Sequence, residues 1–410
     1  MGLEAAISLK DLGIGQVRAE AESRLRCWLL GDATTAWTDE VFLAGLVKEL
    51  RSAGIDIFRV MLALSDAHPQ VWGRILMWRQ GEDVTAINES YKNYRNEEYL
   101  QGPMPVIHGG AAAVRRRLTG NAVVEDFPIV AWLKGLGATD YIAMALPFSD
   151  GTRHFISFTT RRDGGFTEDD LSLLDALIPL IALRVEVAHT RRMMSTLLRT
   201  YLGAHAAARV EAGTIRRAHG EVMNAIIAFA DLRGFTRMSN KLSPADVINV
   251  LSNYYEAVAE PWEARGAEIN KLIGDGMLAL FPLESDDPLY LNARASSVVQ
   301  GVKEAHERLA AIPAEALPGD VKGLRAGFAL HVGDVTFGNV GSKTRLDFTV
   351  IGPAVNEASR LQLLTKTLGR PLLITKAFSA LPRSITFESL GMHELSGFDE
   401  KKEIFALPGF

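Results

Sequence analysis

An almost uninterrupted apolar segment, NAIIAFADL (224–232), predicts a strand that is buried on both faces of a sheet. Such a strand needs other elements to cover it, and the residues that follow supply helix signals. Ser243-Pro244 is typical of a helix start, with serine as N-cap and proline in the first turn, and Gly369 is typical of a helix end. Residues 223–410 are therefore predicted to form an α/β (α+β) fold, with helices packed on one sheet.

The preceding chain divides into two parts. Residues 141–148 and 154–160 read as two strands joined by a polar turn. Thr167, with a carboxylate three residues later, then predicts the start of an amphipathic helix. We expect a first domain over residues 1–188 and a helical linker over residues 189–222, with a break near Gly203. The linker passes signals to the domain that follows or acts as a plain spacer.

Composition excludes several classes of protein. A net charge of −5 over 410 residues argues against general affinity for nucleic acid or an anionic membrane. The sequence has no run of about 18 apolar residues, so no membrane-spanning helix is expected. Cys27 is the single cysteine, which excludes an intrachain disulfide, fits a cytoplasmic protein, and is predicted to be a buried thiol in an apolar helix.

Two acidic residues stand at turns that follow apolar strands. Asp231 ends the strand of FADLRGFT (229–236), where a carboxylate for a metal would stand beside backbone N–H groups for phosphate oxygens. Asp275 lies between two glycines in NKLIGDGM (270–277), at the tip of a predicted hairpin. Each has a structural alternative: Asp231 as a helix cap and Asp275 as a turn residue. Side by side, the two carboxylates would repel each other unless cations lie between them.

Two further polar groups share one helix face. Asn356 and Arg360 are four residues apart in DFTVIGPAVNEASR (347–360), so they project from the same side of the predicted helix. Together an amide and a guanidinium can hold a phosphoryl group and the charge that develops on it. The alternative is an ordinary pair on a helix surface.

Together the three segments, in this order and spacing, resemble the class III nucleotidyl cyclases, the adenylate and guanylate cyclase family. The resemblance covers residues 223–410. It implies a ferredoxin-like catalytic domain with a mixed central sheet. It also implies an adenylate cyclase, a phosphorus–oxygen lyase that converts ATP to 3′,5′-cyclic AMP and pyrophosphate.

The resemblance assigns metal and phosphate roles. Asp231 and Asp275 match the aspartates that hold two divalent ions, magnesium or manganese. In the family one ion lowers the pKa of the ribose 3′-hydroxyl for in-line attack on the α-phosphate, and the other neutralises the triphosphate and pyrophosphate. The backbone N–H groups of Gly234, Phe235 and Thr236 would bind the pyrophosphate.

The resemblance also assigns recognition of the base. Lys271 matches the lysine that recognises adenine, and Thr349, seven residues before Asn356, matches its partner position. Many adenylate cyclases have aspartate there and a subgroup has threonine, whereas guanylate cyclases usually have glutamate and cysteine at the pair. Lys271 donates to adenine N1 and Thr349 accepts from the exocyclic amine, a pattern that guanine reverses. ATP is therefore expected over GTP, and Asp347, two residues off register, is left unassigned.

The remaining matches concern ribose, phosphate and charge. Asn356 corresponds to the asparagine that orients the ribose, and Arg360 to the arginine that stabilises charge at the α-phosphate. Arg345 lies near the family's phosphate-binding basic position. Lys401 and Lys402 are both available for the late lysine that contacts the triphosphate, and the sequence does not choose between them.

The family places its site between two protomers, so the resemblance implies a homodimer with two equivalent sites. Residues 1–188 end in a pattern that resembles the last part of a GAF domain, a regulatory module that takes a small-molecule or protein ligand. Trp72, Trp78 and Tyr91 are candidates to line a ligand pocket there, with ordinary core as the alternative. The run Arg115–Arg117 is interpreted as a solvated face.

Two other functions remain open from the sequence. One is a guanylate cyclase. The other is a catalytically inactive, nucleotide-binding regulator that retains the cyclase fold without the activity. The presence of both aspartates, the asparagine and the arginine favours an active enzyme.

Overall fold

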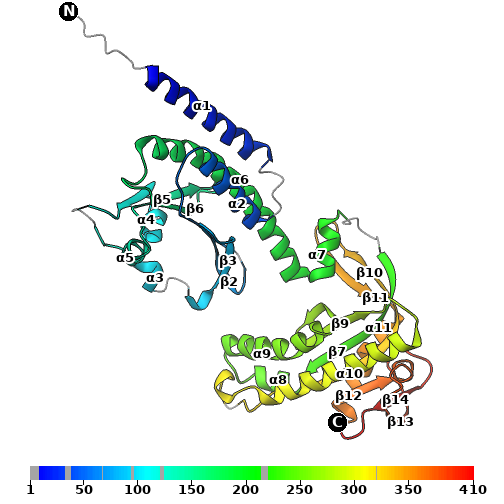
Figure 1. Ribbon diagram of the computed structural model, residues 1–410. Coiled ribbons are helices and arrows are strands. Elements are labelled where there is room, and N and C mark those ends of the chain that lie inside the picture. Colours follow the sequence, from blue (N-terminus) through cyan, green and yellow to red (C-terminus); the bar gives the residue numbers. More distant parts are fainter. Residues whose placement is uncertain are drawn as a thin grey trace, which may run out of the picture. The chain divides into compact units, whose positions relative to one another are not determined.

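The computed structural model describes residues 9–32, 38–66, 68–93, 97–120, 124–213, 220–319 and 321–410. The chain divides into two compact units, Met1–Leu197 and Leu198–Phe410 (Figure 1). Within the described residues, no helix has an apolar segment long enough to cross a lipid bilayer.

The first unit is built on an antiparallel sheet, which has six strands among the described residues, in the order β3-β2-β1-β6-β5-β4. The strands are β1 (Arg59–Ser65), β2 (Val71–Arg79), β3 (Thr85–Ser90), β4 (Ala113–Arg117), β5 (Asp140–Pro147) and β6 (Arg153–Thr160). The predicted hairpin is confirmed, since β5 and β6 pair from Asp140↔Thr160 to Pro147↔Arg153.

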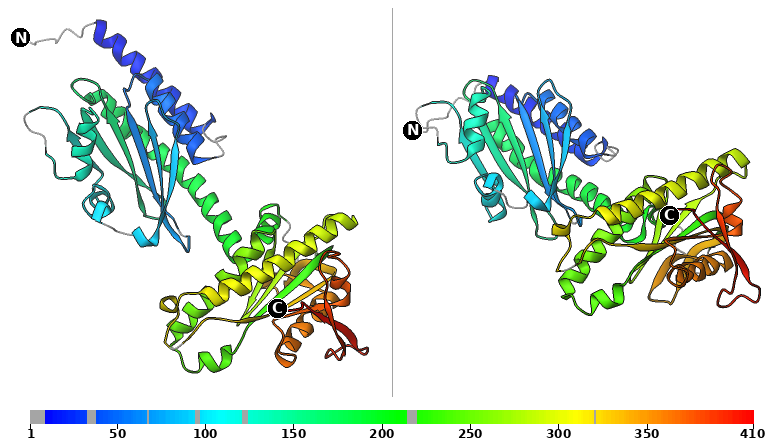
Figure 2. Two further views of the ribbon diagram at one scale, coloured as in Figure 1. Left: turned by 60° about the horizontal axis from the view of Figure 1, so that its bottom comes forward. Right: turned by 90° about the horizontal axis from the view of Figure 1, so that it is seen from below.

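Helices cover both faces of this sheet. The larger core lies under α1 (Leu9–Leu30), α2 (Asp39–Ser52) and α6 (Glu168–Leu202) (Figure 2). A smaller core lies on the opposite face, under α4 (Met104–His108) and α5 (Pro128–Gly135). Two short elements, the 3₁₀ turn η2 (Tyr91–Asn93) and α3 (Glu97–Leu100), connect β3 to α4.

The start of α6 is a capping box, as the sequence predicts. The backbone N–H of Asp170 donates to Thr167 Oγ1 at 3.1 Å, and the backbone N–H of Thr167 donates to Asp170 Oδ2 at 3.0 Å. The two bonds satisfy N–H groups that have no partner inside the helix.

The prediction of a buried Cys27 is wrong, because this side chain is exposed. Leu25 and Leu29 of α1 enter the core, at 0 % and 2 % exposure. Their spacing of four places them on one face of the helix, and Cys27, midway between them, points away from it.

Arg115 does not belong to a solvated face. Its Nη2 lies 2.6 Å from Asp140 Oδ2, and Asp140 is completely buried. Asp140 also accepts from the backbone N–H groups of Tyr141 and Phe166, both at 3.0 Å. The pair therefore ties β4, β5 and the start of α6 together.

We expect Asp140→Ala to destabilise the first unit by about 3–5 kcal/mol, because it leaves Arg115 without its partner in a buried site. Asp126→Ala is the matched control, since Arg116 and Asp126 form an ion pair that is partly exposed, and its cost should stay within about 1 kcal/mol. Urea unfolding followed by tryptophan fluorescence measures both. Equal losses in the two variants would contradict the assignment.

The second unit contains a mixed sheet, with eight strands among the described residues in the order β13-β14-β12-β10-β7-β9-β8, and β11 pairs with β10. The strands are β7 (Gly220–Leu232), β8 (Glu268–Ile273), β9 (Gly276–Pro282), β10 (Ala326–Gly341), β11 (Leu346–Ile351), β12 (Leu372–Thr375), β13 (Glu388–His393) and β14 (Lys402–Ala406). Only β10 and β12 pair in parallel among the described pairings.

The apolar segment at 224–232 lies in β7, which is central and covered on both faces, as predicted. On one face lie α9 (Pro244–Glu263) and α10 (Pro288–Ala311), which enclose the largest core of this unit. On the other face lie α7 (Ala204–Glu211) and α11 (Pro353–Thr367). The short helices α8 (Phe235–Ser239) and α12 (Lys376–Ser379) and the 3₁₀ turn η3 (Ala314–Ala316) complete the unit.

The predicted helix boundaries in this region are confirmed. The break at Gly203, with φ of 84°, separates α6 from α7. Ser243 caps α9 by accepting from the backbone N–H of Asp246 at 3.2 Å. Gly369, with φ of 63°, follows the end of α11 in the left-handed conformation that favours glycine.

Candidate functional site

The two predicted aspartates lie next to each other at one end of the sheet. Asp231 is near the end of β7, opposite Gly276 of β9, and Asp275 occupies the tight turn before that glycine. The backbone N–H of Leu232 donates to the carbonyl of Asp275 at 3.0 Å. The central strand and the β8–β9 hairpin therefore fix the two carboxylates side by side.

This pair is electrostatically strained. Burial raises the pKa of Asp275 above its ordinary value, and the neighbouring Asp231 carboxylate raises it further. A backbone hydrogen bond and Lys366 lower the pKa of Asp275 in part. The pKa of the buried Tyr254 is raised by burial first and then by Asp231. The site therefore carries a concentration of negative charge that favours a cation.

Lys366, at the end of α11, supplies one positive charge. Its Nζ lies 2.6 Å from Asp231 Oδ2, although this oxygen has no hydrogen bond of acceptable geometry. We regard the contact as charge compensation rather than a fixed bond, since the Lys366 side chain is half exposed. No signal in the sequence indicates Lys366, because it lies 135 residues from Asp231 and only the packing of α11 on β7 brings it there.

The chain turns sharply after β7. Gly234 has φ of 76° and precedes α8, whose first residues are Phe235 and Thr236. The N–H groups at such a helix start have no partner within the helix. In the described part of the chain, no hydrogen bond from these three N–H groups is found. They lie directly after Asp231, where anionic oxygens of a ligand would meet them.

Asn356 and Arg360 occupy the exposed face of α11. The buried face of this helix consists of Ala358, Leu361, Gln362 and Thr365. The side chains of Asn356 and Arg360 make no hydrogen bond or ion pair with other described residues. The predicted spacing is therefore confirmed, and both groups are available to a partner outside this chain.

Lys271 and Thr349 lie on neighbouring elements, β8 and β11, but do not bond to each other. Lys271 forms an ion pair with Asp347. Thr349 donates to Asn270 Oδ1 at 3.4 Å. The resemblance assigns no role to Asp347, which is two residues off register. Alternate residues of a strand share a face, however, so Asp347 and Thr349 both face β8.

The other basic candidates lie elsewhere. Arg345 is exposed in the turn between β10 and β11. Lys401 pairs with Glu394 at 3.4 Å and Lys402 with Glu357 at 3.6 Å. Both lysines line a pocket of about 500 Å³ beside His331. Among the described residues, no contact joins Lys401 or Lys402 to the aspartate pair.

The candidate residues therefore form two groups. The first is the carboxylate pair with the turn at Gly234 and with Lys366. The second is a set on α11, β8 and β11, which consists of the exposed Asn356 and Arg360 and the partly buried Lys271 and Thr349. No hydrogen bond or ion pair between described residues connects the second group to Asp231 or Asp275.

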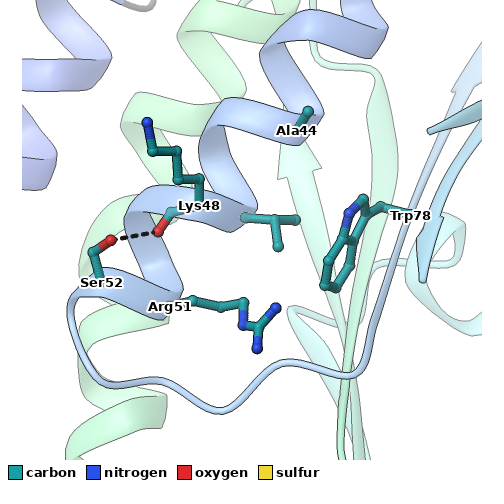
Figure 3. Close-up of a pocket in the computed structure, with 6 residues that line it drawn as sticks. Ala44, Lys48, Arg51, Ser52 and Trp78 are labelled. Atoms are coloured by element: carbon teal, nitrogen blue, oxygen red, sulfur yellow. Dashed lines mark hydrogen bonds between the residues drawn. The ribbon is translucent and has the colours of Figure 1, made fainter. Parts of the chain in front are cut away.

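In the first unit, only one of the predicted pocket residues lines a described pocket. Trp78 closes one side of a pocket of about 470 Å³ against α2, together with Lys48 and Arg51 (Figure 3). The Arg51 guanidinium lies 5.8 Å from the Trp78 ring centroid. Trp72 instead packs edge-on against Tyr99, and Tyr91 is 49 % exposed.

Comparison with known proteins supports the C-terminal unit as an enzyme domain. Residues 218–409 match the family described as the adenylate and guanylate cyclase catalytic domain. An adenylate cyclase of Anabaena cylindrica is 35 % identical over 151 residues, which are 37 % of this chain and 29 % of that protein. Adenylate cyclase 1 of Rhizobium meliloti (strain 1021) is 29 % identical over 182 residues, 44 % of this chain and 27 % of that protein. The match thus spans less than a third of these relatives' own length.

Solved structures include similar domains. The adenylyl cyclase CyaB from P. aeruginosa is 26 % identical, with a TM-score of 0.40, over 46 % of this chain and 95 % of that chain. The guanylyl cyclase Cya2 is 24 % identical, with a TM-score of 0.40, over 46 % of this chain and 93 % of that chain. From the family match and the curated relatives, residues 218–409 form a class III adenylate and guanylate cyclase catalytic domain with adenylate cyclase homologues.

Proposed function

We propose that this protein is an adenylate cyclase that converts ATP to 3′,5′-cyclic AMP and pyrophosphate. The observation that carries the proposal is the pair of adjacent aspartates at the end of β7 and in the β8–β9 turn. Within a cyclase catalytic domain, such a pair has the chemistry of a metal-dependent phosphoryl-transfer site.

Asp231 and Asp275 fit two divalent metal ions, magnesium or manganese. The raised pKa of Asp275 and the position of Lys366 both indicate a deficit of positive charge at these carboxylates. Magnesium in proteins commonly takes one or two carboxylates and completes its shell with water and phosphate oxygens. When bound, these ions would activate the ribose 3′-hydroxyl and neutralise the phosphates.

Other residues of the chain bind the phosphates, orient the ribose and stabilise the transition state. The N–H groups of Gly234, Phe235 and Thr236 bind phosphate oxygens at the pyrophosphate end, and Arg345 adds positive charge there. Asn356 orients the ribose by hydrogen bonding. Arg360 stabilises the charge that develops as the 3′-oxygen attacks the α-phosphate in line and pyrophosphate departs.

The domain works as a homodimer in this proposal. Asn356 and Arg360 are exposed, and their side chains have no hydrogen-bond or ion-pair partner among the described residues. Exposed apolar side chains also occur on β8, β10 and β11, namely Leu272, Ile273, Val340, Leu346 and Ile351. A second copy of this chain would cover the apolar residues and bring Arg360 to the metal site of its partner.

The first unit is proposed to regulate the cyclase. A six-stranded antiparallel sheet with helices on both faces is consistent with a GAF-like domain of residues 1–188. Residues 189–222 include the end of α6 and the whole of α7, and Ala206 and Ala207 of α7 are buried against the catalytic unit. A movement of α6 would therefore be passed to α7 and to the sheet that carries Asp231.

Lys271 and Thr349 select adenine. We expect purified protein to form cyclic AMP from ATP with little product from GTP, and Lys271→Ala to lower kcat/KM for ATP by about 10- to 100-fold, because a donor to the base is lost. Lys322→Ala, which changes an exposed lysine outside the site, is the control. The measurement quantifies both cyclic products with magnesium or manganese present.

The same assay tests the alternatives. A cyclic GMP rate equal to or above the cyclic AMP rate would favour a guanylate cyclase and contradict the role of Lys271 and Thr349. No product from either nucleotide, combined with measurable nucleotide binding, would favour a catalytically inactive regulator.

Lys366 should compete with metal ions for Asp231. We expect Lys366→Gln to tighten manganese binding about threefold without nucleotide, because a screened positive charge is removed from a half-exposed position. Lys376→Gln, which removes a lysine paired with Glu403, is the matched control. Electron paramagnetic resonance titration of free manganese measures both affinities. Unchanged or weaker binding in Lys366→Gln would show that Lys366 does not compete.

A further inference from the structure

Arg59, the first residue of β1, is buried without a carboxylate partner. The side chain is 2 % exposed, and its Nε and Nη1 have no hydrogen-bond acceptor among the described residues. Its Nη2 has only the sulfur of Met61, a weak acceptor, at 3.3 Å. A buried guanidinium in this condition is strongly destabilising unless something else supplies negative charge.

The charged and titratable groups nearest to Arg59 do not supply a negative charge. The groups that shift its pKa, besides burial, are the hydroxyl of Tyr141 and the guanidinium of Arg79. Arg79 is directly opposite Arg59 on β2 and is itself paired with Glu82. By contrast Arg115, on the same sheet, has the fully buried Asp140 as its partner.

Further unpaired donors stand beside Arg59. Thr159 lies opposite Arg59 on β6, and Tyr141 lies opposite Thr159 on β5, so the three form a row across the sheet. Ser157 is two residues along β6 on the same face. The hydroxyl oxygen of Thr159 is buried and has no hydrogen-bond partner among the described residues. The buried hydroxyl of Ser157 has only the neighbouring hydroxyl of Tyr141 beside it. All of these groups can donate a hydrogen bond.

The helix α5 covers the row formed by Arg59, Thr159 and Tyr141. This face of the sheet is covered by α5, whose Val130 and Leu133 are fully buried. Trp132 of the same helix lies 5.6 Å from the Arg59 guanidinium and remains 45 % exposed. The partly exposed ring of Trp132 therefore lies next to the buried guanidinium of Arg59.

We propose that Arg59, Ser157 and Thr159 form a binding site for a small monocarboxylate anion between the sheet and α5 of the first unit. The guanidinium presents two parallel N–H donors that match the two oxygens of a carboxylate, and the hydroxyls donate to the same oxygens. The apolar side chains around the row limit the ligand to a small one. A single guanidinium balances a single negative charge.

The test uses the full-length protein with sodium acetate as the probe and sodium chloride at equal ionic strength as the reference. Five of the six tryptophans precede residue 198, so tryptophan fluorescence reports mainly on the first unit. Acetate should raise the unfolding midpoint of this unit by several degrees relative to chloride. Phosphate and nitrate are run in parallel, and a larger shift from either anion would overturn the carboxylate assignment.

Arg59→Met should abolish the acetate shift, and its midpoint without acetate should equal or exceed that of the wild type, because a buried unpaired charge is removed. Arg79→Met, the matched control, removes an arginine already paired with Glu82 and should keep the shift. An acetate shift that persists in Arg59→Met would overturn the proposal, as would its absence in the wild type.

Two further variants keep the test decisive if Arg59→Met fails to fold. Thr159→Val should weaken acetate binding about tenfold by calorimetry, since one donor is lost. Acetate bound beside Trp132 should also change the tryptophan fluorescence of the folded protein, and Trp132→Phe should remove this change while leaving binding intact. Unchanged affinity in Thr159→Val together with an acetate response that does not depend on Trp132 would overturn the site.

Discussion

Asp231→Asn is expected to lower the rate of cyclic AMP formation by at least about 10³-fold, with both magnesium and manganese. The amide has nearly the shape of the carboxylate but not its charge, so the backbone of β7 and the turn at Gly234 should be preserved. What is lost is the attraction for a divalent cation at the point where charge develops on phosphate. Metal-ion catalysis contributes several kcal/mol to such a reaction, and each 1.36 kcal/mol corresponds to a tenfold change in rate.

A control separates loss of charge from loss of structure. Asp334 is an exposed carboxylate on β10, where it accepts from the Asn224 amide at 2.8 Å, and it lies outside the proposed site. Asp334→Asn should keep wild-type activity within about twofold, since exposed contacts of this kind contribute little. Product formation by Asp231→Asn at more than a tenth of the wild-type rate would contradict the metal assignment.

A second measurement on Asp231→Asn does not depend on activity. The pKa of Asp275 is raised partly by the Asp231 carboxylate. Removing that charge should lower the pKa of Asp275 toward its ordinary value, because the protonated form is no longer favoured by repulsion. Carbon-detected NMR titration of the side-chain carboxyls in metal-free buffer would record the change. An unchanged pKa of Asp275 would mean that the two carboxylates do not interact.

Local signals in the sequence were sufficient for much of the fold. The capping box at Thr167, the N-cap at Ser243 and the glycine at 369 are each decided by residues within one helical turn, and the structure confirms all three. The hairpin that carries Asp275 was predicted for the same reason, since its turn chemistry is local.

Contacts made across the fold were not predictable. Lys366 reaches Asp231 only because α11 packs on β7, and Asp140 meets Arg115 only because β4 and β5 are neighbours. Neither pairing leaves a periodic trace in the sequence. The prediction that Cys27 is buried was wrong for a different reason. The mostly apolar segment around it does not show which face of the helix meets the core.

Asp347 is an intermediate case. The sequence shows that Asp347 is two residues from Thr349, and strand geometry places both residues on one face of β11. The position was nevertheless left unassigned, because a match to a family pattern compares residues at fixed register and does not consider neighbours. In the structure the Asp347 carboxylate forms an ion pair with Lys271.

The second large effect concerns the assembly. Arg360→Ala is expected to lower cyclic AMP formation by about 10²- to 10³-fold, as removal of a group that stabilises transition-state charge commonly does. Its side chain is exposed and has no partner among the described residues, so the fold should be unaffected. Asp231→Asn and Arg360→Ala would then each be nearly inactive, for reasons that lie in different halves of the proposed site.

Mixing the two inactive variants should restore activity if the sites are shared between protomers. With free exchange at equal concentrations, half of the dimers contain one chain of each kind. In such a dimer, Asp231 of one chain meets Arg360 of the other at one site, while the second site lacks both. One intact site in two, in half of the dimers, gives about a quarter of the wild-type rate. Two variants of the same residue, Arg360→Ala and Arg360→Met, should give no recovery when mixed. If the Asp231→Asn and Arg360→Ala mixture also shows none after exchange is verified by mass spectrometry, each site must be built from a single chain.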